Sequence, residues 1–265
     1  MRKIIFSDVD GTLLNSNHKI TKLTEEAIKN IIYEKNYPFV IVSARSPSGI
    51  YPILNKYNFN CYIVSYSGGL ILDDKKNVLY HKGFSKKEAT NIINFIEENK
   101  LDLSWCLYSF DQWIVKDKND LRIINEENIV EAQAISGNVN SVTKNEINKI
   151  LCICNPSEII KIEELLKEKF NDYSIVKSSD CLLEIMQKGI NKANAIKFLC
   201  HYLNIHLKDS IAFGDNYNDL EMLETVGIGF LMDNAPEELK KRIANHTKDN
   251  NNDGIYYALK SINLI

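Results

Sequence analysis

The chain has 265 residues, of which 45% are hydrophobic and 25% are charged, and its formal net charge is −3. These values are typical of a globular protein with one large domain or two modest ones. They argue against nucleic acid as the main partner, because no basic excess is available to meet a phosphate backbone, and no apolar run is long enough to span a bilayer.

The first part of the chain alternates strands and helices. A short apolar run, residues 4–6, predicts a buried strand that ends in Asp8 and Asp10. Apolar residues at helical spacing predict a helix that Thr21 can cap, and Pro47 is expected to open a second helix that runs to about Lys56. Two further buried strands are expected at residues 38–42 and 61–64. This alternation predicts a parallel, doubly wound sheet.

The middle of the chain has a different pattern. Residues 70–72 and 78–80 are expected to form a β-hairpin across a polar turn. After it we expect helices at 86–99, 119–127 and 156–170, and strands at 103–108, 113–116, 149–154, 173–176 and 181–185. Antiparallel strands with helices on one side indicate a separate α+β domain.

The alternation of strands and helices returns near residue 190. We expect a helix at 191–203, a buried strand at 210–213, a short helix around Met222, a strand at 226–232 and two final helices that begin at Pro236 and Gly254. One α/β sheet domain is therefore expected to be built from both ends of the chain, residues 1–82 and 188–265. The second domain, residues 83–187, is expected to be inserted between them.

Cysteine usage and the start of the chain bear on the compartment. The six cysteines lie among apolar neighbours without the usual spacing of a zinc site, which favours buried free thiols in a reducing cytosol. The first expected strand begins close to Met1, so we expect no signal peptide. We therefore expect a cytoplasmic protein.

Polar side chains follow four of the expected parallel strands. They are Asp8 and Asp10, Ser43, the Ser67-Gly68-Gly69 turn, and the group Asp215, Asn218 and Asp219. Because the carboxyl ends of parallel strands meet at one edge of a sheet, we expect these side chains to share one site. Three or four carboxylates would repel one another unless a cation lay between them, and ligands that are all oxygen favour magnesium. Each aspartate alone can also be a helix cap or a turn former, but that reading is poor for the whole set.

Four segments, in this order, resemble the four motifs of the haloacid dehalogenase (HAD) superfamily: Asp8-Val9-Asp10-Gly11-Thr12, Ser43, Lys192 and Gly214-Asp215-x-x-Asn218-Asp219. Further segments, among them Gly189-Ile190-Asn191-Lys192-Ala193 and Asn234-Ala235, resemble its Cof-type phosphatase subfamily. The resemblance implies a Rossmann-like α/β HAD core with an inserted α+β cap of the C2B type between the second and third motifs.

The resemblance implies a magnesium-dependent phosphatase that hydrolyses small phosphomonoesters through an aspartyl-phosphate intermediate. Asp8 would be the nucleophile, and Asp10 would protonate the leaving alcohol and then take a proton from the attacking water. Sugar phosphates are the substrate class that the resemblance favours. Flavin mononucleotide and pyridoxal phosphate stay open as substrates, and the oligomeric state is not indicated.

The resemblance also implies the phosphate and metal contacts. Phosphate is expected to meet the backbone near Val9, the hydroxyl of Ser43, the amide of Ala44, Lys192 and Asn218. Lys192 stands at a helix start, where a cation opposes the helix dipole, which is itself a hint of function. The expected Mg²⁺ ligands are Asp8, the backbone carbonyl of Asp10, and Asp215, with Asp219 or Asn216 joining directly or through water.

Two departures and two alternatives accompany this assignment. Relatives commonly have Thr-Gly-Arg where this chain has Ser43-Ala44-Arg45, and Asn-Gly where it has Ser67-Gly68-Gly69. Serine keeps a hydroxyl at position 43, but Ser67 lacks the two-ended contacts of an amide. One alternative is a phosphomutase of the phosphomannomutase type. The other is a non-catalytic phosphate-binding module, such as a receiver-like domain phosphorylated on Asp8.

Overall fold

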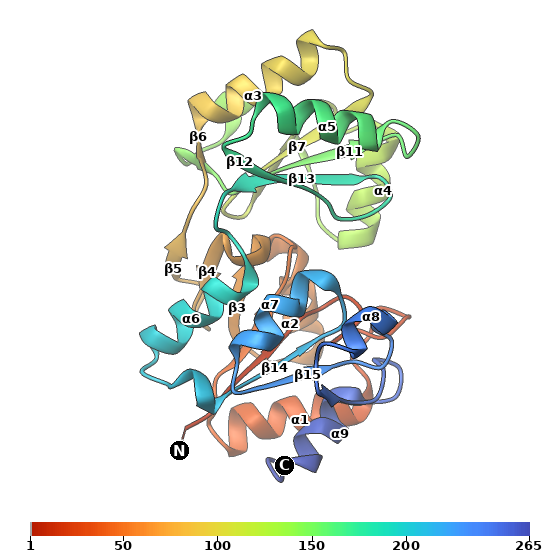
Figure 1. Ribbon diagram of the computed structural model, residues 1–265. Helices are drawn as coiled ribbons and strands as arrows, with labels where there is room; N and C mark the ends of the chain where they lie inside the picture. The colour runs from red at the N-terminus through yellow and green to blue at the C-terminus, as the bar shows by residue number, and fades with distance from the viewer. Residues whose placement is uncertain (1) are drawn as a thin grey trace. The chain divides into compact units, whose positions relative to one another are not determined.

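The computed structural model describes residues 2–265, which divide into two compact units (Figure 1). The core unit comprises residues 2–44, Ile53–Leu79 and Asn191–Ile265, and the inserted unit comprises Arg45–Pro52 and Tyr80–Ile190. The domain boundaries at residues 82–83 and 187–188 stay a prediction. Among the described residues, no helix combines the length and the apolar character that crossing a membrane requires.

The core unit is built on an eight-stranded sheet in the order β16-β15-β14-β1-β2-β3-β4-β5. The strands from β16 to β3 in this order are parallel to their neighbours, and β4 pairs antiparallel with β3. Their bounds are β1 (Ile4–Ser7), β2 (Phe39–Val42), β3 (Tyr62–Ser65), β4 (Leu70–Leu72), β5 (Val78–His81), β14 (Ser210–Gly214), β15 (Ile228–Leu231) and β16 (Asn245–His246). The predicted doubly wound parallel sheet is confirmed, and β4 and β5 extend it at one edge.

Strand β1 lies in the middle of this sheet, between β14 and β2. Ile4, Ile5 and Phe6 have no exposed surface, as expected for a strand covered on both faces. Ser7 pairs with Phe213 on one side and with Ile41 on the other, so the three strands end side by side. Because the chain leaves β1 toward β2 and returns later to β14, the strand order reverses at this point. Open α/β sheets bind their ligands at such a switch point.

Helices cover both faces of the core sheet. Figure 1 shows α1 (Lys22–Lys29) and α9 (Gly254–Ser261) packed together on one side, and α6 (Lys192–Tyr202) and α7 (Leu220–Thr225) on the other. A short helix, α8 (Glu237–Lys240), follows β15. This two-sided arrangement explains why the parallel strands read as continuous apolar runs in the sequence.

The helix that was expected from Pro47 to Lys56 is interrupted. A 3-10 turn covers Pro47–Gly49, and α2 (Tyr51–Tyr57) starts after it. Pro52 has no amide hydrogen and cannot lie inside a regular helix, but the first turn tolerates it. The break therefore places Pro52 in the first turn of α2.

The inserted unit contains a six-stranded sheet in the order β12-β13-β11-β7-β8-β9. All neighbouring pairs are antiparallel except β8 and β9. The bounds are β7 (Leu103–Ser109), β8 (Gln112–Val115), β9 (Ile135–Ser136), β11 (Lys149–Cys154), β12 (Tyr173–Lys177) and β13 (Leu182–Gln187), with a separate pair of β6 (Phe84–Ser85) and β10 (Glu146–Ile147). The predicted α+β composition of this region is confirmed, but the two-residue strands are too short for a periodic signal in the sequence.

Two helices of the inserted unit, α3 (Lys86–Glu98) and α5 (Ile159–Lys169), contribute to one apolar core. Ile92 of α3 and Ile162 of α5 belong to the same buried cluster as Leu107, Ile150 and Ile185 of the strands. Alternate residues of the strands enter this cluster, as the two-residue period of a strand requires.

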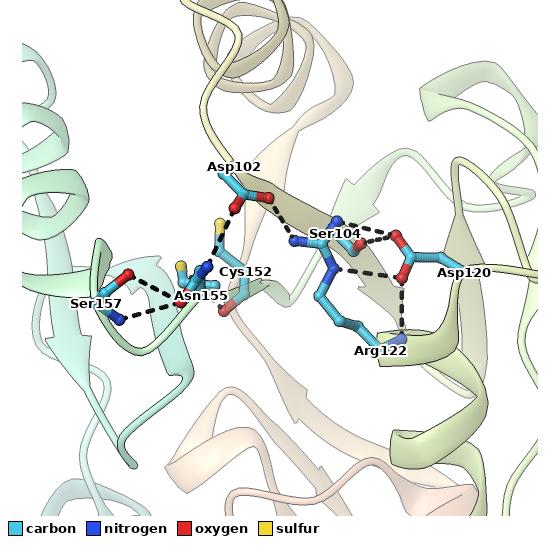
Figure 2. A network of polar contacts seen from close by, with 8 residues as sticks. Asp102, Ser104, Asp120, Arg122, Cys152, Asn155 and Ser157 are labelled. Carbon is cyan, nitrogen blue, oxygen red and sulfur yellow. Dashed lines mark hydrogen bonds and ion pairs between the residues drawn. The ribbon is translucent and has the colours of Figure 1, made fainter.

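A third helix, α4 (Leu121–Val130), is anchored by a polar network (Figure 2). Asp120 caps it by accepting from the amide of Arg122 at 2.9 Å. The guanidinium of Arg122 pairs with Asp120 at 3.1 Å and with Asp102 at 2.9 Å, and Ser104 donates its hydroxyl to Asp120. The network therefore ties the start of α4 to the start of β7.

The capping box at the start of α3 yields a stability prediction. Ser85 Oγ accepts from the amide of Glu88 at 3.2 Å, and Glu88 Oε2 accepts from the amide of Ser85 at 2.7 Å. Replacing such a cap by alanine costs about 1 kcal/mol, so Ser85→Ala is expected to lower the unfolding free energy of the inserted unit by about that amount. Urea unfolding followed by tryptophan fluorescence measures it, because both tryptophans, Trp105 and Trp113, lie in this unit.

Lys87→Ala is the matched control for this cap, because Lys87 is exposed in the same first turn. Its effect is expected to stay within about 0.5 kcal/mol. Equal losses in the two variants would contradict a stabilising role for the capping box.

Candidate functional site

Asp8 follows β1 directly and is almost fully buried, with 7% of its surface exposed. Its amide donates to the carbonyl of Phe213 at 3.0 Å, which continues the pairing of β1 with β14. Its carbonyl accepts from the hydroxyl of Ser7 at 2.8 Å and from the amide of Leu13 at 3.3 Å. The backbone of Asp8 is thus fixed on both sides at the end of the central strand.

Lys192 is the first residue of α6, and its ammonium group joins two carboxylates. Its Nζ lies 2.5 Å from Asp8 Oδ1 and 2.6 Å from Asp219 Oδ1. Only 2% of Lys192 is exposed, and an unpaired cation at such a site would be very unfavourable. Burial alone would lower the pKa of Lys192, but Asp219 and Asp8 together raise it above its ordinary value. The lysine is therefore charged and serves as counter-ion to both carboxylates.

Asp219 closes the turn after β14 and has no exposed surface. Its Oδ1 faces Lys192, and its Oδ2 accepts from the amides of Asp215 at 3.0 Å and Asn216 at 3.1 Å. A Cβ on Gly214 would lie 2.5 Å from the Cβ of Asp219. Only glycine at position 214 lets the turn fold back this closely.

Asp215 is held at both carboxylate oxygens. Thr12 Oγ1 donates to its Oδ1 at 2.7 Å, and Asn234 Nδ2 donates to its Oδ2 at 3.3 Å. Gly11 adopts a φ of +85°, and a Cβ there would lie 2.3 Å from Asp215 Oδ2. Glycine is therefore required both by the turn and by the closeness of the carboxylate.

Asp8, Asp215 and Asp219 form a carboxylate cluster in which one oxygen of each lies within 4.8 Å of the others. Burial raises the pKa of Asp8 well above its ordinary value, and Asp219 adds to this rise while Lys192 opposes it. Burial also raises the pKa of Asp215 to about 6, opposed by the bond from Thr12 and reinforced by Asp219. One lysine cannot compensate the negative charge of three carboxylates. A cluster whose donors are all oxygen fits a hard divalent cation such as magnesium.

Asp10 lies outside this cluster, in the turn after Asp8. It is exposed and forms an isolated bridge with Leu14. Its charge is close enough to contribute to the raised pKa of Asp215. The two aspartates of the first motif therefore differ in setting, one buried against a lysine and the other open to solvent.

Of the expected phosphate contacts, Lys192 is paired with Asp8 and Asp219, whereas the others follow the ends of β1, β2 and β14. Ser43 follows β2, is buried, and donates its amide to Val64 at 2.8 Å, with the partly buried Ala44 next to it. Val9 is buried in the turn after β1. Asn218 is exposed in the 3-10 turn Tyr217–Asp219.

The loop after β3 has an unusual backbone conformation. Tyr66 and Ser67 both have positive φ, at 52° and 53°, a region that non-glycine residues seldom occupy. The amide of Ser67 donates to the carbonyl of Ser43 at 2.9 Å. Ser67, which stands where relatives commonly have asparagine, therefore still contacts the residue that follows β2. It does so through its backbone amide and not through its side chain.

The sequence motifs assign no role to Thr12 or Asn234, although both lie in segments that carry the family resemblance. For Thr12 a signal was present in the sequence, because its hydroxyl closely follows the two aspartates. For Asn234 there was no local signal, because its partners Gly11 and Asp215 are far from it in the sequence.

Comparisons with known proteins identify the family of the chain. Residues 5–259 match the family described as haloacid dehalogenase-like hydrolase. A Haemophilus influenzae protein named "Putative phosphatase" is 37% identical over 260 residues, which cover 98% of each chain. A solved haloacid dehalogenase-like hydrolase from Bacteroides thetaiotaomicron is 27% identical, with a TM-score of 0.89 over 99% of this chain and 100% of that one.

A solved protein described as a HAD subclass IIB sugar phosphatase is 21% identical, with a TM-score of 0.83 over 99% of this chain and 100% of that chain. At that identity the likeness shows a shared fold. The family match, which covers nearly the whole chain, confirms the resemblance expected from the four motifs. The chain therefore belongs to the haloacid dehalogenase-like hydrolases, as a Cof-type member.

Proposed function

We propose that the chain is a magnesium-dependent phosphatase that hydrolyses small phosphomonoesters, sugar phosphates in particular, through a phosphorylated Asp8. The observation that carries this proposal is the buried contact of 2.5 Å between Lys192 and Asp8, beside Asp215 and Asp219. Membership of a hydrolase family supports hydrolysis, and the name of the Haemophilus influenzae relative supports phosphate esters. The sugar class is supported only by the name of the subclass IIB relative.

Asp8 is the proposed nucleophile. Lys192 holds one of its oxygens and so fixes the orientation of the carboxylate at the end of β1. Attack on phosphorus forms a bond between an Asp8 oxygen and phosphorus while the bond from phosphorus to the alcohol oxygen breaks. The product is an acyl phosphate, a reactive mixed anhydride that water can open.

Asp10 is the proposed acid and base. In the first step it gives a proton to the leaving alcohol, and in the second it takes a proton from the water that attacks the phosphoryl group. Release of inorganic phosphate then restores the free carboxylate of Asp8. The exposed position of Asp10 supports this role, because the leaving alcohol departs into solvent and the attacking water arrives from it.

Magnesium, when bound, would neutralise charge between Asp8 and the phosphate. Asp8, Asp215 and the backbone carbonyl of Asp10 are its proposed ligands. Asp219 already accepts from Lys192 and from two amides, so we place it in contact with the ion through water. Asn216, whose side-chain oxygen accepts from the amide of Tyr217 at 2.8 Å, is placed in the same way.

The phosphate oxygens are proposed to meet donors from three segments. The hydroxyl of Ser43 and the amide of Ala44 follow β2, the backbone near Val9 follows β1, and Asn218 follows β14. Lys192 adds a fixed positive charge beside them. Amides and hydroxyls at strand ends form a concave set of donors that suits a phosphate group.

The central test is hydrolysis of p-nitrophenyl phosphate with and without Mg²⁺. We expect activity that chelation abolishes and added Mg²⁺ restores, and a loss of roughly 10³-fold or more in Asp8→Asn, because the nucleophile is removed. Asp233→Asn, which changes an exposed carboxylate outside the cluster, is the matched control and is expected to keep full activity. Full activity in Asp8→Asn would sink the proposal.

A panel of sugar phosphates then tests the substrate class. Inorganic phosphate and isomerised sugar phosphate are to be quantified in the same reactions. Release of phosphate is expected, since the proposed second step uses water. Transfer of the phosphoryl group to another hydroxyl of the sugar would instead indicate a phosphomutase.

Removing the buried lysine is expected to separate metal binding from catalysis. Lys192→Met leaves the two buried carboxylates of Asp8 and Asp219 without their counter-ion, and breaking a buried ion pair in this way costs about 3–5 kcal/mol. We expect the metal-free variant to melt at a much lower temperature than the wild type. Mg²⁺ should then raise its Tm more than that of the wild type, while hydrolysis is lost.

Thermal melts across a Mg²⁺ titration measure this effect. Lys197→Met, an exposed lysine on the same helix, is the control and is expected to behave as the wild type. If Mg²⁺ stabilised Lys192→Met no more than the wild type, the lysine would not share its carboxylates with a metal site.

A further inference from the structure

We propose that Asn234 is a positioning residue that orients Asp215 and the turn at Gly11. The loop of residues 247–253, between β16 and α9, holds Asn234 in place. The proposal rests on the proposed function, in which Asp215 is a magnesium ligand. Asn234 would act through Asp215 and would not itself contact the ion or the substrate.

The side-chain amide of Asn234 bridges two strand ends of the core sheet. Its Nδ2 donates to the carbonyl of Gly11 at 2.9 Å and to Asp215 Oδ2 at 3.3 Å. An amide nitrogen carries two hydrogens, so both bonds can form at the same time. The turn after β1 and the residue after β14 are therefore joined by one side chain from the segment after β15.

The other end of the amide is held as well. Asn234 Oδ1 accepts from the amide of Asn250 at 3.3 Å, and Asn250 Nδ2 donates to the carbonyl of Leu14 at 2.8 Å. Asn251 Oδ1 in the same loop accepts from the amide of Ser16 at 3.1 Å. Because oxygen and nitrogen of the Asn234 amide each have a matching partner, its orientation is set, and the loop is tied to the segment that carries Asp8 and Asp10.

The arrangement around Asp215 indicates more than a structural role. Thr12 holds Oδ1, Asn234 holds Oδ2, and the close approach of Gly11 limits rotation of the carboxylate. Residues that bond to a metal-ligating carboxylate in this way typically change metal affinity or activity by about 10–100-fold when they are removed. Asn234 itself is exposed, so its loss should cost little packing.

The test is Mg²⁺ binding to Asn234→Ala, measured by titration calorimetry on the metal-free protein and by the Mg²⁺ concentration that gives half of the maximal rate with p-nitrophenyl phosphate. We expect both quantities to shift about 10–100-fold toward weaker binding. At saturating Mg²⁺, kcat and KM should lie near the wild-type values, because the groups that attack and that bind phosphate are intact. The Tm of the metal-free protein should also be close to that of the wild type.

Asn252→Ala is the matched control. Asn252 is an exposed asparagine in the same loop whose Nδ2 donates to both carboxylate oxygens of Asp249 at 2.9 Å, and its replacement is expected to leave Mg²⁺ affinity unchanged. Unchanged Mg²⁺ affinity in Asn234→Ala, or a lower Tm without a change in affinity, would overturn the positioning role alone. A wild-type protein that neither binds Mg²⁺ nor hydrolyses the ester would overturn the proposed function and this inference together.

Discussion

The site depends on one buried ammonium group between two carboxylates. Lys192 comes from the start of α6, Asp8 from the end of β1 and Asp219 from the turn after β14. A cation at a helix start opposes the helix dipole, and its burial is favourable only while both carboxylates are present. The pair of contacts therefore fixes three distant segments relative to one another. A surface lysine could not do this, because exposed ion pairs contribute little.

Around this contact the aspartates differ in their hydrogen-bond partners. Asp219 is turned inward, toward Lys192 and the amides of its own turn, whereas Asp215 is held by side chains from other segments. Asp8 shares the lysine with Asp219 and stands at the end of the central strand. Three carboxylates that look alike in the sequence thus have three settings, which burial and hydrogen bonding distinguish. The two glycines, Gly11 and Gly214, let these settings lie within a few ångströms of each other.

Much of the architecture could be predicted from the sequence, because buried parallel strands leave unbroken apolar runs and a parallel sheet brings their carboxyl ends to one edge. The fold class and the clustering of Asp8 with Asp215 and Asp219 were accessible in this way, whereas the family followed from the resemblance of the four motifs. What was missed has physical reasons. The 3-10 turn before Pro52 and the two-residue strands are too short to show a periodic pattern of apolar residues. Thr12 bonds to Asp215 across about two hundred residues of sequence, and Asn234 bonds to it across about twenty. No local sequence pattern indicates either bond.

The central claim, that Asp8 carries the phosphoryl group, is tested most directly in Asp10→Asn with p-nitrophenyl phosphate. The nitrophenolate leaves without a proton, so the first step should proceed, while the second step should be slow without a base. The account predicts a burst of nitrophenolate equal to the enzyme concentration, and a phosphoryl group on Asp8 in peptides from acid-quenched protein. A phosphoryl group on another residue, or a burst with Asp8 unmodified, would contradict it.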